Sequence, residues 1–334
     1  MYNSNKMFFY FILLFSTLIT ISSNSWFGCW IGLEINLLSF IPLISNSKNM
    51  MASEASLKYF LTQSIASINF LFSIIMKMIF MMNFELNNII SIMINSSLLM
   101  KMGSFPFHFW FPNIVEGMSW INNFILMTWQ KISPMILLSY YFNNNFIIFI
   151  SLVNVMIGAV GGLKHTSIRK LMAFSSINNL GWMLMSIMIS ENLWLFYFLI
   201  YMVLIGMLFF FFYLLNMFFI NQIYILNMNY SIKLFLLINF LSLGGLPPFI
   251  GFFPKWITIN FFIMNNLYSI IFIFIMMSLI MLFFYIRIIY SSFMFNFLKL
   301  KWMKIFIKNK HMIMINFFSF LSISSMLLST LIYF

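Results

Sequence analysis

Eleven long apolar segments, separated only by short polar breaks, run along nearly the whole of the 334-residue chain. A helix needs about 20 apolar residues to cross the roughly 30 Å hydrocarbon layer of a bilayer. No break is long enough to form a folded domain outside the membrane. We therefore predict an all-α polytopic membrane protein with a single membrane domain over residues 1–334. The predicted spans are 7–23, 25–45, 56–79, 88–111, 119–141, 146–163, 170–190, 193–219, 233–263, 268–293 and 313–333.

The composition agrees with this fold class and argues against several kinds of site. Hydrophobic residues make up 63% of the chain and charged residues 7%, whereas soluble domains carry about 25% charged residues. The single cysteine excludes a disulfide framework and a thiolate-bound iron–sulfur cluster. The sequence contains no Asp and no phosphate-binding glycine motif. We therefore expect no metal and no redox cofactor in this chain.

Basic residues outside the spans fall on one side of the predicted membrane. Loops on the N-terminal side carry Lys6, Lys48, Lys164, Arg169, Lys170, Lys233 and a cluster from Lys299 to Lys310. The opposite loops carry Glu85, Glu191 and asparagines. By the positive-inside rule, the N-terminus lies on the cytoplasmic or matrix side and eleven spans place Phe334 on the other side. The abundance of Phe, Met, Ile, Asn and Lys is typical of A/T-rich organellar genes. We therefore predict the mitochondrial inner membrane, with the N-terminus in the matrix and the C-terminus in the intermembrane space.

Four ionisable residues lie well inside predicted spans: Glu34, Lys101, Lys131 and Lys255. A charge at the bilayer centre costs at least about 2.5 kcal/mol, so these side chains must face one another or water. Burial disfavours the charged form of both residue types and an opposite charge favours it, so such groups change protonation when a neighbour moves. The pattern predicts a proton path. A static ion pair is the alternative, although one glutamate cannot neutralise three lysines.

Two predicted spans are interrupted by glycine and proline. The fourth span contains Gly103-Ser104-Phe105-Pro106, and the ninth contains glycines and prolines between 244 and 254. Each is the fourth span of a block of five, so we predict two inverted five-helix repeats over 7–141 and 146–293, with a broken helix in each and a last helix at 313–333. Inverted repeats with matching broken helices are typical of ion-transport proteins. Proline kinks used only for packing are the alternative.

For other ionisable residues near the spans, a purely structural role is an alternative to a functional one. His108, two residues after Pro106, could relay protons as a neutral imidazole or serve as a hydrogen-bonded polar residue near the helix end. Glu54 and Lys58 are four residues apart, which predicts a local pair on one helix. No basic stripe interleaved with aromatic residues is present, so we predict no nucleic-acid partner.

Five segments of the sequence carry a resemblance to a known family. They are Ser53–Gln63, Lys101–Pro112, Thr128–Pro134, Arg169–Ser176 and Leu243–Trp256. In this order they resemble the subunit 2 family of mitochondrial NADH dehydrogenase (respiratory complex I), of arthropod type. The resemblance covers nearly the whole chain.

This resemblance implies an antiporter-like subunit in the membrane arm of NADH:ubiquinone reductase. Its function would be proton translocation coupled to electron transfer from NADH to ubiquinone, with NADH, FMN, iron–sulfur clusters and ubiquinone held by other subunits. Its partners would be neighbouring antiporter-like subunits and lipids such as cardiolipin. A subunit of a cation/proton antiporter and a non-conducting structural subunit of the membrane arm remain the alternatives.

The resemblance also implies roles for individual residues. Glu34 would pair with Lys101, Lys131 would link the two halves of the protein, and Lys255 would continue the hydrophilic axis. The chain departs from the family at Asn179, where relatives often have histidine. Because asparagine does not titrate, a proton relay through this span would have to use water.

Overall fold

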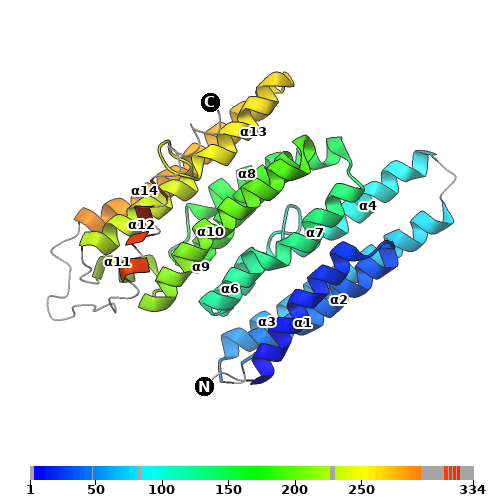
Figure 1. Cartoon of the computed structure of the whole chain (residues 1–334), viewed down its shortest axis with the longest axis horizontal. Coiled ribbons are helices and arrows are strands. Elements are labelled where there is room, and N and C mark those ends of the chain that lie inside the picture. Colours follow the sequence, from blue (N-terminus) through cyan, green and yellow to red (C-terminus); the bar gives the residue numbers. More distant parts are fainter. Residues whose placement is uncertain are drawn as a thin grey trace. The chain divides into compact units, whose positions relative to one another are not determined.

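Every regular element that the structure describes is a helix. The computed structural model describes residues 4–46, 48–80, 84–225 and 230–294, together with a few positions between 312 and 323. The helices are α1 (Ser4–Ser22), α2 (Trp26–Ile44), α3 (Met50–Ile79), α4 (Phe84–Met102), α5 (Trp110–Gly117), α6 (Trp120–Met127), α7 (Trp129–Tyr140), α8 (Asn144–Gly162), α9 (Ile168–Ile189), α10 (Glu191–Leu215), α11 (Ile220–Ile225), α12 (Tyr230–Gly244), α13 (Phe252–Met264) and α14 (Tyr268–Met294) (Figure 1).

The described helices confirm the predicted class of all-α polytopic membrane protein. Seven of them, α1, α2, α3, α8, α9, α10 and α14, are long and apolar enough to cross a membrane. Three further predicted spans are present as interrupted helices, namely α4 followed by α5, α6 followed by α7, and α12 followed by α13. The eleventh predicted span, 313–333, lies largely outside the described residues, as does the basic cluster between Lys299 and Lys310.

The chain divides into two compact units, Met1–Ile150 and Ser151–Phe334. In the first unit, α1 packs on α2, α2 packs on α3, and α3 packs on α4 and α5. In the second unit, α9 packs on α10 and α13, while α12 packs on α10 and α14 (Figure 1). Every residue of α9 from Leu171 to Ile187 is buried. Because this stretch of α9 is buried on all sides, the helix lies in the interior of the protein.

The break at the end of α4 follows a regular capping motif. Gly103 has a φ of 72°, in the left-handed region that favours glycine. Its N–H donates to the Met100 carbonyl at 3.2 Å, and the Ser104 N–H donates to the Leu99 carbonyl at 3.1 Å. This pair of bonds is the Schellman motif, which satisfies carbonyls left free at a helix C-terminus.

The end of α12 repeats the same motif in the second unit. Gly245 has a φ of 81°. Its N–H donates to the Ser242 carbonyl at 3.0 Å, and the Leu246 N–H donates to the Leu241 carbonyl at 3.2 Å. The predicted broken helix of each unit is therefore confirmed, and both helices stop at a left-handed glycine that precedes proline.

The fifth predicted span contains an interruption that the sequence did not predict. Thr128 separates α6 from α7 with backbone angles of −115° and −76°, and its hydroxyl donates to the Phe124 carbonyl at 2.6 Å. The same carbonyl also accepts the Thr128 N–H at 3.0 Å, so the last hydrogen bond of α6 is kept and the hydroxyl adds to it. Lys131 follows in the first turn of α7, where its N–H donates to the Thr128 carbonyl at 3.1 Å.

The Schellman glycine of α12 provides a stability test. We expect Gly245→Ala to destabilise the protein by about 1–2 kcal/mol, the cost of a left-handed alanine. An added Cβ would also come within 2.9 Å of the Lys255 side chain. The measurement is thermal unfolding of the solubilised, assembled protein. Gly244→Ala is the matched control, because a Cβ there meets neighbours no closer than 3.4 Å. Equal stability of the two variants would contradict this account.

Candidate functional site

The first buried lysine, Lys101, lies in the last turn of α4 directly before the break. Its side chain is buried, with 8% of its surface exposed. Gln63 of α3 donates its side-chain Nε2–H to the Lys101 carbonyl at 3.1 Å. A side chain from a neighbouring helix thus provides a donor for a carbonyl that lies next to the interruption. This contact fixes the backbone of Lys101 and leaves its ammonium group for other interactions.

Glu34 of α2 is half-buried and acts on Lys101 through its charge. Its Oε2 atom is buried and has no hydrogen-bond partner among the described residues. The two side chains do not form a direct ion pair in this part of the chain. The resemblance implied that they pair. The structure brings them within electrostatic reach of each other, so their interaction depends on the distance between α2 and α4.

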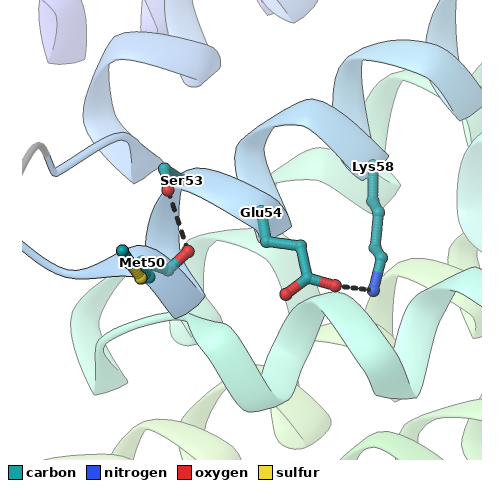
Figure 2. Close-up of polar contacts among 4 residues, drawn as sticks. All are labelled: Met50, Ser53, Glu54 and Lys58. Carbon is teal, nitrogen blue, oxygen red and sulfur yellow. Dashed lines mark hydrogen bonds and ion pairs between the residues drawn. The ribbon is translucent and has the colours of Figure 1, made fainter.

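The predicted pair of Glu54 and Lys58 forms on the surface of α3. Figure 2 shows the Lys58 ammonium donating to the Glu54 carboxylate one turn away, and the Ser53 hydroxyl donating to the Met50 carbonyl at 2.8 Å. The two charged side chains are 58% and 47% exposed, in the order Glu54 and Lys58. Exposed i,i+4 pairs contribute about 0.5 kcal/mol or less. This pair is therefore separate from the buried charges.

Lys131 of α7 is almost completely buried, with 1% of its surface exposed. Its ammonium nitrogen lies 5.4 Å from the centroid of the Phe111 ring. The adjacent residue, Gln130, forms two reciprocal hydrogen bonds with Asn36 of α2, at 2.9 and 3.1 Å. This amide pair joins the helix that carries Glu34 to the helix that carries Lys131, and so limits how far the two can separate.

Lys255 lies in the first turn of α13 and reaches back across the second break. Its ammonium nitrogen donates to the Gly244 carbonyl at 3.0 Å and to the Leu243 carbonyl at 3.5 Å. It also lies 5.7 Å from the centroid of the Trp182 ring of α9. A cation is stabilised at a helix C-terminus by the free carbonyls and the helix dipole. Lys255 therefore stabilises the end of α12, a task that a neutral Gln63 performs at the first break.

His108 lies in the loop between α4 and α5. It is 8% exposed, and its ring centroid lies 4.0 Å from that of Phe109. Its Nδ1 atom is buried without a partner among the described residues. His108 is therefore a buried side chain of the break itself.

Several buried polar contacts and groups in the structure were not predicted from the sequence. Asn95 of α4 and Ser133 of α7 are fully buried, and their side-chain polar atoms have no protein partner within the described ranges. Lys233, expected in a loop, lies in α12 and is 5% exposed. Tyr197 of α10 donates to the Asn179 side-chain oxygen at 3.2 Å. Buried polar groups are costly unless they are hydrogen-bonded, so Asn95 and Ser133 are expensive residues to bury at these positions.

The fold and the buried charges define a class of protein. Each unit contains an apolar helix that breaks at a glycine and carries a buried lysine at the break, which is the pattern of membrane-embedded ion transporters. A family described as NADH:quinone oxidoreductase/Mrp antiporter, transmembrane, matches residues 23–281.

Individual relatives narrow the class. The chain is 52% identical to NADH-ubiquinone oxidoreductase chain 2 of Anopheles gambiae, over 99% of this chain and 98% of that one. It is also 52% identical to the protein of the same name from Aedes aegypti, over the same shares of the two chains. The chain therefore belongs to the NADH-ubiquinone oxidoreductase chain 2 family. A chain of respiratory complex I from Thermus thermophilus has a similar fold, with a TM-score of 0.86 at 18% identity, over 99% of this chain and 79% of that chain.

The amide pair between α2 and α7 gives a second prediction. We expect Asn36→Leu to destabilise the protein by about 1–3 kcal/mol, because it leaves the half-buried Gln130 amide without its partner. The double variant Asn36→Leu/Gln130→Leu should recover part of this loss, since neither amide is then unpaired. Thermal unfolding of the four proteins of this double-mutant cycle measures the coupling. Strictly additive losses would show that the pair contributes nothing.

Proposed function

We propose that this chain is an antiporter-like subunit in the membrane arm of NADH:ubiquinone reductase and takes part in proton translocation. Electrons would pass from NADH to ubiquinone in other subunits of the enzyme. The observation that carries this proposal is the placement of three buried lysines, Lys101, Lys131 and Lys255, at or beside helix interruptions. Near full-length similarity to proteins named NADH-ubiquinone oxidoreductase chain 2 supports it.

The proposed mechanism begins with the charge of Glu34. When Glu34 moves away or is neutralised, the protonated form of Lys101 loses the attraction that stabilises it. A proton then passes through water to Lys131 and on to Lys255. The lack of a direct Glu34–Lys101 ion pair among the described residues supports this scheme, because a tight, hydrogen-bonded pair would be expensive to separate in a buried environment.

The remaining features of the proposal concern the surroundings of the subunit. The five-helix repeats would span 7–141 and 146–293, and the last helix 313–333. The N-terminus would face the matrix of the mitochondrion and the C-terminus the intermembrane space. Neighbouring antiporter-like subunits and lipids such as cardiolipin would contact the apolar surface. NADH, FMN, iron–sulfur clusters and ubiquinone would bind to other subunits.

A cation/proton antiporter is the second candidate function, because the family description includes the Mrp antiporters. Purification from native membranes separates the two candidates. Isolation with an NADH-oxidising assembly supports the proposal, whereas isolation with antiporter subunits alone contradicts it. A non-conducting structural subunit is the third candidate, and the lysine variant described next tests it.

Replacement of Lys101 tests the proton path directly. We expect Lys101→Met in the assembled complex to lower proton pumping by about tenfold or more, because a positioned proton-transfer group contributes at least about a hundredfold to its step. The measurement is proton uptake or release by reconstituted vesicles, together with NADH oxidation.

The matched control for this prediction is Lys58→Met. Lys58 is exposed and paired with Glu54 on the same unit (Figure 2), so its loss should leave pumping unchanged. Pumping at the wild-type rate in Lys101→Met would contradict the proposed mechanism and favour a non-conducting structural subunit.

A further inference from the structure

The second break leaves Lys255 with one hydrogen-bond donor to spare. The last four carbonyls of α12 belong to residues 241–244. The first two accept backbone N–H groups of the capping motif, and the last two accept from the Lys255 ammonium. An ammonium group has three N–H donors, so these two carbonyls leave one. A neutral amine keeps two, enough to satisfy both carbonyls. Lys255 can therefore gain or lose a proton without leaving the end of α12 unsatisfied.

A small cavity lies beside Lys255 in the second unit. Among the residues that line it, Lys255, Asn179, Tyr197, Tyr201 and Ser242 carry polar side chains. Its volume is about 10 Å³. One water molecule needs about 10–15 Å³ by this measure and two to four polar partners. The cavity matches a single water molecule in size and in chemistry.

The hydrogen bonds around the cavity leave suitable partners for a water molecule. The Tyr197 hydroxyl donates to Asn179 Oδ1 at 3.2 Å, so its own oxygen keeps lone pairs that can accept. The Ser242 hydroxyl donates to the Asn239 carbonyl at 2.8 Å and likewise keeps an accepting oxygen. A water molecule that accepts from Lys255 can thus donate one hydrogen to each hydroxyl oxygen, and the loss of either acceptor leaves one of these hydrogens unpaired.

We propose that this cavity binds one water molecule that accepts the third N–H of Lys255, and that Tyr197, oriented by Asn179, is a positioning residue for it. Asn179, which stands where relatives often have histidine, then has a positioning role although it does not titrate. Its amide oxygen accepts the Tyr197 hydroxyl proton and leaves the lone pairs of that hydroxyl available to water. The role of this water in proton transfer rests on the proposed function, whereas its binding does not.

The first test is a map of the assembled complex at a resolution that shows ordered water. We expect density within hydrogen-bond distance of the Lys255 nitrogen in the wild-type cavity, and its loss in Tyr197→Phe. The control is Tyr213→Phe, which removes a hydroxyl from the same helix at a position that is 48% exposed. An empty wild-type cavity overturns the proposal, and a water that persists in Tyr197→Phe overturns the role of Tyr197.

The second test separates positioning from simple stability. We expect Asn179→Leu to lower pumping by up to about tenfold, the effect of losing one hydrogen bond between neutral groups. Asn179→His keeps an acceptor for the Tyr197 hydroxyl and should pump at a rate close to that of the wild type. Equal losses in both variants contradict the positioning role. If Lys101→Met pumps normally while the water is present, the proposed function fails and the water site stands.

Discussion

The constraint on which the rest of this structure depends is the hydrogen bonding of backbone carbonyls where a helix breaks within an apolar protein. In hydrocarbon, irregular backbone is tolerated only where protein or water satisfies its polar groups. Both α4 and α12 meet this requirement first through a left-handed glycine, Gly103 or Gly245, that turns the chain back onto its own last turn. The carbonyls that remain must find donors on other helices.

The two breaks find those donors in different ways, and this difference gives their lysines different tasks. At the first break, the neutral amide of Gln63 donates a hydrogen bond to the Lys101 carbonyl. The Lys101 ammonium is therefore left to interact with Glu34. At the second break, the Lys255 ammonium itself donates hydrogen bonds to two carbonyls of α12. The two breaks share one backbone motif, but Lys101 interacts electrostatically with a carboxylate whereas Lys255 is hydrogen-bonded to a helix end.

The fold was predictable because its signals are local. Apolar length identifies spans, and Gly and Pro mark the breaks at 103–106 and 244–254 in the sequence alone. The break at Thr128 was missed because a threonine carries no such signal. The Asn36–Gln130 pair was missed for another reason, since its partners lie 94 residues apart and two polar residues in spans do not reveal which contacts which.

The sequence by itself determined that this chain lies in a membrane and that α4 and α12 end at glycine and proline. It also determined that Glu34, Lys101, Lys131 and Lys255 are too deeply placed to be loops, because the cost of polar groups in hydrocarbon depends on residue type and distance along a span. The tertiary structure decided which groups satisfy those charges and carbonyls. It held Glu34 near Lys101 without a direct ion pair, and it turned Lys255 onto the end of α12. Such pairings depend on how helices far apart in the sequence pack together, and periodicity along a single helix does not specify that packing.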